Sequence, residues 1–316
     1  MKVFVTREIP EAGLILLKKN GFEVDVYKED HAIPRKDFLN QIRDCDALIP
    51  LLTEKIDKEA IDKMKKCKAI ANYAVGFNNI DVDYAICKGI TVTNTPDVLT
   101  DSTADLVMAL VLACARKIPE AEKLVRDKKF KGWKPKLFLG MELRDKYFGI
   151  LGAGRIGSAV TKRAYAFGCK ILYFSDIKNV EIEKKFGAKR VSLNSLLKES
   201  DIISIHLPLN KKTYNLLNEN NLHLLKKSAI LINTARGEIV DEKVLIALLK
   251  ENKIFAAGLD VYENEPKVNK EFYKLKNIVL LPHIGSATIE ARDKMAILAA
   301  KNVIAVLAGK KALTPV

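Results

Sequence analysis

The sequence has little cysteine and no long hydrophobic run. Its five cysteines are an odd number and no two form a C-x-x-C pair, so neither a disulfide framework nor a zinc site is indicated. The longest apolar run, Leu106 to Ala115, is far shorter than the roughly 20 residues that a bilayer requires. The N-terminus soon turns polar and lacks the apolar core of a signal peptide. We therefore expect a cytoplasmic protein without a membrane partner.

Acidic residues are fewer than basic ones, 39 against 53, and the formal net charge is +14. A basic nucleic-acid binder is therefore one alternative to consider, which salt-sensitive DNA binding would test. The lysines, however, are dispersed along helical patterns among acidic residues, which is typical of a solvated surface. We expect no nucleic-acid partner, and a positive field that draws in small acidic substrates.

Short apolar runs alternate with helical patterns in two series. Five strand-like runs lie before residue 95 and six more follow from Tyr147, which predicts parallel sheets. The last amphipathic stretch, 288–309, precedes no further strand and can pack back onto the first domain. We predict an α/β protein with a doubly wound Rossmann domain (99–287) and a smaller, discontinuous flavodoxin-like substrate domain (1–98 and 288–316).

Between the two series, a long buried helix is expected to begin near Ser102. Ser102 and Asp105 have the spacing of a capping box, and Pro119 should break the helix. A second helix follows over 120–130, and the stretch 131–143 reads as an extended arm. The long apolar helix and the aromatic side chains of the arm would be exposed on a monomer, so an assembly is expected.

A phosphate-binding turn is predicted at "GILGAGRIG". Gly152, Gly154 and Gly157 stand in the G-x-G-x-x-G pattern between a strand and a helix. The first glycine makes the turn, the second admits a pyrophosphate to the backbone, and the third lets the helix pack on the strand. Asp176 ends the next strand near the offset of the carboxylate that binds the adenosine ribose, which favours NAD over NADP. Lys178 leaves some tolerance for NADP.

A dinucleotide-dependent enzyme also needs a proton donor and an anchor for its substrate. His283 follows an apolar strand, but its position alone leaves a catalytic and a structural role equally open. Glu265 and Arg236 end two other strands. A carboxylate beside an imidazole favours the protonated form and fixes the tautomer, while an arginine can hold a substrate carboxylate with two hydrogen bonds. The three together indicate a general acid with an anion site.

Several motifs in order resemble one family over nearly the whole chain. They are "NYAVGFNNIDVDYAICKGITVTNTPDVLTDSTADL", "GILGAGRIG", "LINTARGEIVDE", "AGLDVYENEP" and "LLPHIGSAT". Together these segments resemble the D-isomer-specific 2-hydroxyacid dehydrogenases, and within them most closely the glyoxylate/hydroxypyruvate reductases. The resemblance implies reduction of a small 2-oxoacid to a D-2-hydroxy acid by NADH, with NADPH as an alternative cofactor, no metal, and a homodimer.

The resemblance also implies roles for individual residues. His283 is the acid/base, Glu265 its partner and Arg236 the residue that binds the substrate carboxylate. The N–H groups of Val75 and Gly76 complete a cradle for that carboxylate. Further residues implied at the pocket or the cofactor are Ser286, Thr103, Arg155, Ile156, His206, Pro208, Thr234 and Asp260.

Other functions remain open at this point. D-3-phosphoglycerate dehydrogenase and D-lactate dehydrogenase share the architecture and the reaction type. A corepressor-like protein that senses NAD through the same fold is an alternative of another class. The complete set of Arg236, Glu265 and His283 argues for an active enzyme over a binding protein.

Overall fold

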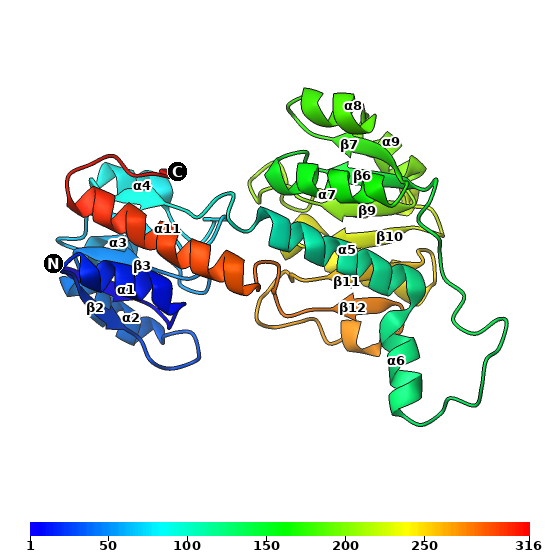
Figure 1. Ribbon diagram of the computed structural model, residues 1–316, viewed down its shortest axis with the longest axis horizontal. Helices are drawn as coiled ribbons and strands as arrows, with labels where there is room; N and C mark the ends of the chain where they lie inside the picture. The colour runs from blue at the N-terminus through cyan, green and yellow to red at the C-terminus, as the bar shows by residue number, and fades with distance from the viewer. The chain divides into compact units, whose positions relative to one another are not determined.

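A computed structural model describes residues 1–316 as two compact units (Figure 1). Unit 1 comprises Met1–Leu99 and Ser286–Val316, and unit 2 comprises Thr100–Gly285. Each unit is built on one parallel sheet of its own. The two apolar series of the sequence therefore correspond to two separate sheets.

Unit 1 contains a five-stranded sheet in the order β2-β1-β3-β4-β5. Its strands are β1 (Lys2–Val5), β2 (Glu23–Val26), β3 (Ala47–Ile49), β4 (Ala69–Ala71) and β5 (Thr91–Thr93). Its helices are α1 (Glu11–Lys19), α2 (Arg35–Gln41), α3 (Lys58–Lys63), α4 (Val82–Cys87) and α11 (Ile289–Leu307), with a 3-10 turn η1 (Ile42–Asp44). This strand order is that of flavodoxin-like folds, as predicted.

The C-terminal helix α11 completes unit 1 by packing on α1 (Figure 1). Thr288 caps its first turn, because the Thr288 hydroxyl accepts the Ala291 N–H at 3.2 Å. Gly13 of α1 lies so close that a Cβ there would stand 2.5 Å from the Ala296 carbonyl oxygen. The two helices, distant in sequence, thus meet at backbone contact.

Unit 2 contains a seven-stranded sheet in the order β12-β11-β10-β9-β6-β7-β8. Its strands are β6 (Tyr147–Leu151), β7 (Lys170–Phe174), β8 (Lys189–Arg190), β9 (Ile202–Ile205), β10 (Ile230–Asn233), β11 (Ala256–Leu259) and β12 (Ile278–Leu280). Its helices are α5 (Thr100–Arg116), α6 (Ile118–Arg126), α7 (Arg155–Ala166), α8 (Val180–Phe186), α9 (Leu193–Glu199) and α10 (Glu242–Lys250). Three 3-10 turns, η2 (Leu222–Leu224), η3 (Gly237–Ile239) and η4 (Phe272–Lys274), lie in its loops.

The order of the strands reverses between β6 and β9, where the chain leaves one half of the sheet for the other. Doubly wound sheets bind their ligands at such a switch point, beyond the carboxyl ends of the strands. The central strands β9 and β10 are buried along their whole length, as strands covered by helices on both faces must be. The predicted α/β class with a Rossmann sheet is confirmed.

Several local predictions were wrong. A seventh strand, β8, was missed because its two residues are charged and exposed. The helix α5 begins at Thr100, so Ser102 lies inside it and donates to the Gly285 carbonyl at 3.0 Å instead of capping. It ends at Arg116, because Lys117 is left-handed (φ 52°), before the expected break at Pro119.

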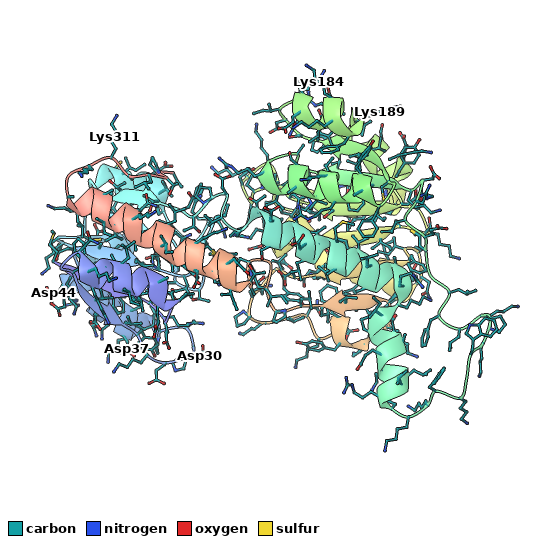
Figure 2. The ribbon with its side chains drawn as sticks, viewed as in Figure 1. Asp30, Asp37, Asp44, Lys184, Lys189 and Lys311 are labelled. Carbon is teal, nitrogen blue, oxygen red and sulfur yellow. The ribbon has the colours of Figure 1, made fainter.

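Charged side chains of both signs stand on the surface of each unit (Figure 2). Lys184 and Lys189 lie at the edge of unit 2 near α8, and Asp30, Asp37 and Asp44 lie on unit 1. Many pair locally, as Lys185 does with Glu181 at 2.8 Å along α8. No helix is long and apolar enough to cross a membrane.

Candidate active site

Three functional side chains come from the ends of neighbouring strands of unit 2. Arg236 follows β10, Glu265 follows β11, and His283 follows β12. These strands are parallel and adjacent in the sheet, so their carboxyl ends lie at one edge. The predicted triad is therefore brought to the edge where doubly wound sheets bind ligands.

His283 and Glu265 are joined by a hydrogen bond. The His283 Nδ1 lies 2.7 Å from Glu265 Oε2, which leaves Nε2 as the ring nitrogen for a substrate. Burial alone would raise the pKa of Glu265, but the hydrogen bond and charge of His283, with the charge of Arg236, hold it below its usual value. Glu265 is thus ionised at neutral pH and favours a protonated imidazole.

The turn that carries His283 is held by a buried carboxylate. His283 adopts a left-handed conformation (φ 56°), which is unusual for a residue with a Cβ. Asp260 accepts the next two backbone groups, Ile284 N–H and Gly285 N–H, each at 2.7 Å. Burial raises the pKa of Asp260 although these two bonds oppose the rise. Asp260, which was expected at the cofactor, uses both carboxylate oxygens to hold the turn of His283.

A second buried carboxylate was not singled out from the sequence. Glu242, the first residue of α10, accepts the Glu263 N–H at 2.8 Å and is 7% exposed. An acidic residue in the first turn of a helix is ordinarily explained by the helix dipole, so the position of Glu242 in the sequence did not indicate a function. In the structure it contacts the segment that carries Glu265.

Arg236 lies partly buried at the end of β10. Its NH1 donates to the Ala235 carbonyl at 2.6 Å, and Asn233 fixes the backbone by donating to the Arg236 carbonyl at 2.8 Å. Burial lowers the pKa of Arg236, while the negative charges of Glu265 and Glu238 oppose that shift. A guanidinium always stays charged in proteins, so this position offers a fixed positive charge in a restricted solvent environment.

The glycine-rich turn has the shape that a pyrophosphate requires. Gly152 is left-handed (φ 97°), and a Cβ on Gly157 would lie 2.0 Å from the Gly152 carbonyl oxygen. A Cβ on Gly154 would meet no atom within 4 Å, so this face of the turn is open. Arg155 and Ile156 begin α7, whose N-terminal N–H groups face that opening without a side-chain cap.

Two buried side-chain atoms just beyond the ends of β9 and β10 lack a hydrogen-bond partner within the protein. They are His206 Nε2, after β9, and Thr234 Oγ1, after β10. Burial lowers the pKa of His206 to about 3, so its ring is neutral at neutral pH. Buried polar atoms are normally hydrogen-bonded, and these two fit a bound dinucleotide. Pro208, also expected here, is exposed and its carbonyl accepts the Thr213 hydroxyl at 2.5 Å.

The expected ribose-binding residue, Asp176, lies exposed just after β7. Arg190 of β8 donates to the Ser175 carbonyl at 3.1 Å and to the Asp176 carbonyl at 2.8 Å. Lys178 pairs with Glu183 at 3.2 Å. The Asp176 carboxylate thus lies in a segment whose backbone is held by Arg190. Its oxygens can accept hydrogen bonds from the ribose hydroxyls.

Val75 and Gly76 lie in the turn after β4 of unit 1. Asn94 donates to the Val75 carbonyl at 2.8 Å, and Asn72 donates to the Gly76 carbonyl at 2.7 Å. These contacts do not use the N–H groups that were expected to bind an anion. The two asparagines were not predicted, because an amide after a strand has many structural uses.

The two remaining candidates are less informative. Thr103 is buried inside α5, and its side chain would stand 3.5 to 3.6 Å from a Cβ on Gly285, so it packs beneath the turn of His283. Ser286 is half-buried and its carbonyl accepts the Thr288 N–H at 2.9 Å. The other two histidines, His31 and His223, are exposed, and His223 lies in the 3-10 turn η2.

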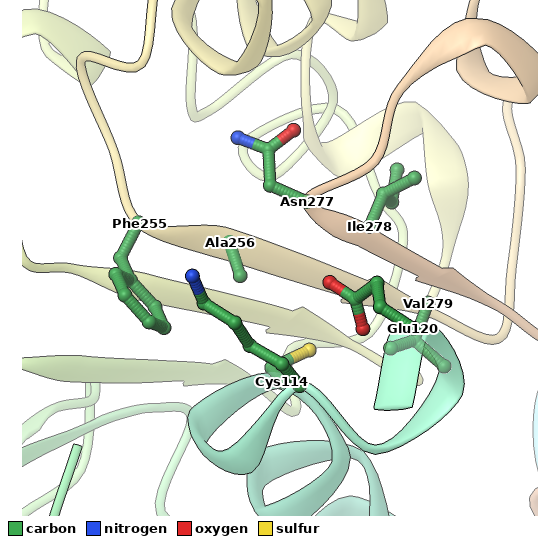
Figure 3. A pocket seen from close by; sticks show the side chains of 8 residues that line it. Cys114, Glu120, Phe255, Ala256, Asn277, Ile278 and Val279 are labelled. Atoms are coloured by element: carbon green, nitrogen blue, oxygen red, sulfur yellow. The ribbon is translucent and has the colours of Figure 1, made fainter. Parts of the chain in front are cut away.

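A small pocket exists at the opposite ends of the strands (Figure 3). It lies where β11 and β12 begin, against the end of α5, and Lys117 stands over the Phe255 ring at 5.3 Å. Its volume of about 20 Å³ holds little more than one water molecule. It therefore cannot take a dinucleotide and is separate from the candidate site.

Comparison with known proteins identifies the family. The sequence model described as "D-isomer specific 2-hydroxyacid dehydrogenase, NAD binding domain" matches residues 108–285. The glyoxylate reductase of Thermococcus litoralis is 52% identical over 313 residues, which cover 98% of this chain and 94% of that protein. The chain belongs to the D-isomer specific 2-hydroxyacid dehydrogenase family. The predicted family and the predicted NAD-dependent oxidoreductase are confirmed.

Solved structures of this family agree with that result. The glyoxylate reductase from Paecilomyes thermophila is 34% identical with a TM-score of 0.89, covering all of this chain and 98% of that one. The NADPH-dependent glyoxylate/hydroxypyruvate reductase from Sinorhizobium meliloti is 31% identical with a TM-score of 0.86, covering 100% and 97%. Both likenesses extend over the whole chain.

Proposed function

We propose that this dehydrogenase reduces small 2-oxoacids, glyoxylate and hydroxypyruvate first, to D-2-hydroxy acids. The hydrogen bond between His283 and Glu265, at the strand edge that also carries Arg236, is the observation that carries the proposal. The relatives support this choice of substrate, since the T. litoralis protein is a glyoxylate reductase and the S. meliloti enzyme acts on glyoxylate and hydroxypyruvate by name.

The chain's own groups divide the reaction between them. His283 donates the Nε2 proton to the carbonyl oxygen, while Glu265 at Nδ1 stabilises the imidazolium before transfer. Arg236 holds the substrate carboxylate and polarises the neighbouring carbonyl. The N–H groups of Val75 and Gly76 provide further donors for the carboxylate. The reduced nicotinamide ring, when bound, supplies the hydride that completes the reduction.

The open turn, His206 and Thr234 would hold the dinucleotide, with NADH preferred over NADPH. A carboxylate at Asp176 accepts bonds from a ribose diol and repels a 2′-phosphate. NADPH remains a second cofactor in this proposal, because the S. meliloti relative is NADPH-dependent and Arg190 and Lys178 lie near Asp176 in the chain and the sheet. We assign the dinucleotide and the acid/base pair to unit 2, and part of the binding of the 2-oxoacid to unit 1.

Initial rates of NADH and NADPH oxidation test the proposal. The assay uses glyoxylate, hydroxypyruvate, pyruvate and phosphohydroxypyruvate, with chiral analysis of the products. We expect NADH oxidation with glyoxylate and hydroxypyruvate and a D product from the latter. Preference for phosphohydroxypyruvate or pyruvate would reassign the substrate to the D-3-phosphoglycerate or D-lactate type. If neither NADH nor NADPH is oxidised with any 2-oxoacid, the proposed reaction is overturned and a binding function is favoured.

We also propose a cytoplasmic homodimer. Trp133 is 83% exposed and Phe130 57% exposed in the segment after α6, and Leu139 is exposed as well. Helix α6 itself buries none of its residues, although Ile118 and Val125 are apolar. Large exposed apolar groups in one stretch are typical of a subunit interface. Light scattering after size exclusion should give twice the chain mass of 35.3 kDa, and a monomeric mass would overturn the dimer.

A further inference from the structure

Glu242 is a buried carboxylate that the proposed reaction does not use. It is 7% exposed, and its Oε1 accepts the Glu263 N–H at 2.8 Å. Burial raises the pKa of Glu242, and the negative charges of Glu263, Glu238 and Asp241 raise it further, although the Glu263 N–H opposes the shift. Placing a carboxylate there is costly, so the bond that it makes calls for an explanation.

The segment that Glu242 holds is the one that positions the catalytic carboxylate. Within it, the Tyr262 N–H donates to Glu265 Oε1 at 3.0 Å, and the Tyr262 hydroxyl donates to the Leu281 carbonyl at 2.8 Å. Gly237 packs against the same segment, since a Cβ there would lie 2.0 Å from the Tyr262 carbonyl carbon. The backbone before Glu265 is therefore held by close packing against Gly237 and by the hydrogen bond to Glu242.

We propose that Glu242 is a positioning residue for the acid/base pair. By accepting the Glu263 N–H, it holds the segment from Tyr262 to Glu265 so that the Glu265 carboxylate stays 2.7 Å from His283 Nδ1. This inference rests on the proposed function, because it assigns Glu242 to the same acid/base step.

The role requires a hydrogen-bond acceptor, not a charge. Without the acceptor, the Glu263 N–H loses its partner and the segment relaxes toward other acceptors or water. The charged groups that interact with the imidazole are Glu265, which makes the direct bond, and Asp260, while Arg236 interacts with Glu265. When Glu265 moves away, the imidazolium is less stabilised and His283 loses its proton at a lower pH. A glutamine at position 242 retains an acceptor oxygen and should preserve the geometry.

Three variants separate this role from a plain structural one. Glu242→Ala removes the acceptor, Glu242→Gln keeps it without the charge, and Asp241→Ala is the matched control. Asp241 caps α10 by accepting the Lys243 and Val244 N–H groups at 2.9 and 3.1 Å, so its loss weakens the helix without touching the segment of Glu265. The readouts are kcat and KM for NADH, the pH profile of reduction, and NMR titration of the His283 ring.

We expect Glu242→Ala to lower kcat about tenfold with the KM for NADH little changed, since a small misplacement at the reacting groups costs rate. Its upper pH limit for reduction and the titration midpoint of His283 should both fall by about half a pH unit. Glu242→Gln should restore the upper pH limit and the titration midpoint of His283. Asp241→Ala should lower Tm but leave the pH limit and the midpoint unchanged.

Three results would overturn the inference. They are an unchanged pH limit and ring titration in Glu242→Ala, a Glu242→Gln variant as impaired as Glu242→Ala, and an Asp241→Ala variant that shifts the ring titration equally. The NMR titration needs no turnover, so it tests the coupling of Glu242 to His283 even if every 2-oxoacid assay fails. Failure of the proposed function and failure of this inference are therefore distinguishable.

Discussion

The turns that follow the strands are held differently in the two units. In unit 2, Asp260 accepts backbone N–H groups beside the catalytic histidine, so the turn depends on carboxylate acceptors. In unit 1, the amides of Asn72 and Asn94 donate to the carbonyls of Gly76 and Val75. In unit 2, a charged carboxylate occupies the N–H groups of the turn. In unit 1, neutral amides bond to the carbonyls and leave the N–H groups of the turn available. The first suits proton transfer and the second suits binding of an anion.

This difference predicts where pH acts. The turn of unit 2 carries ionisable side chains, whereas the amides and backbone groups of the unit 1 turn are not ionisable. Changes to the groups at the unit 2 turn should therefore alter both the rate and its pH dependence, while changes to the unit 1 turn should alter substrate binding alone. The following variants test this division, beginning with the largest effect.

His283→Ala should lower kcat roughly 1000-fold, because general acid catalysis contributes about 100-fold to 10,000-fold. The affinity for NADH, measured by fluorescence titration without substrate, should change little. His223→Ala is the matched control, since that histidine is exposed and its ring contacts only the Glu219 carbonyl at 3.1 Å. Turnover near the wild-type value in His283→Ala would exclude this residue as the acid.

Glu265→Gln should shift the pH profile of reduction and lower kcat about tenfold. The pKa of Glu265 lies below its usual value, so the carboxylate is charged throughout the working range and stabilises the imidazolium. Reduction needs the imidazolium and is lost as pH rises. Removing the charge should therefore move the upper pH limit down by about one unit. An unshifted upper pH limit would contradict the proposal that Glu265 stabilises the His283 imidazolium.

Asn94→Ala tests the neutral turn of unit 1. Losing one hydrogen bond of about 1 kcal/mol should raise the KM for the 2-oxoacid about fivefold. The pH limits should stay at the wild-type values, because no charged group is removed. A shifted pH profile in this variant would break the division between the two units. Asn277→Ala, which removes a contact to the Leu249 carbonyl in unit 2, serves as a control for general destabilisation.

The smallest effect concerns acid stability. Burial lowers the pKa of His206 from 6.5 to about 3, so between these values the unfolded chain binds a proton that the folded chain does not. Stability is therefore complete above pH 6.5 and falls as pH decreases, by roughly 1 kcal/mol per pH unit. His206→Asn should flatten this part of the unfolding profile measured with urea. His31→Asn, at an exposed site, should leave the slope unchanged.

The regular parts of the fold were predictable because burial leaves a pattern in the sequence. Strands such as β9 and β10 are continuous apolar runs, and the turn at Gly152 has a sterically required composition. The strand β8 was not predictable, since two exposed charged residues carry no such pattern. The start of α5 was misplaced because Ser102 has the spacing of a cap, yet its hydroxyl bonds to Gly285, which is distant in sequence.

Within the candidate site, the sequence pointed to side chains with distinctive chemistry and did not point to side chains that bond to backbone groups. Arg236, Glu265 and His283 are chemically distinctive at strand ends. Glu242 instead accepts an N–H from a residue 21 positions away, and which backbone group it meets depends on tertiary packing. For the same reason, the bonds from Asp260 to the turn of His283 were not predictable.

The split of unit 1 across the chain determines when it can form during synthesis. Residues 100–285 contain every strand and helix of unit 2, so that unit can close while later codons are still being read. Unit 1 must wait, because Gly13 meets Ala296 only after α11 has left the ribosome. Strand β1 is therefore synthesised first, but its sheet is the one that is completed last, when α11 packs on α1.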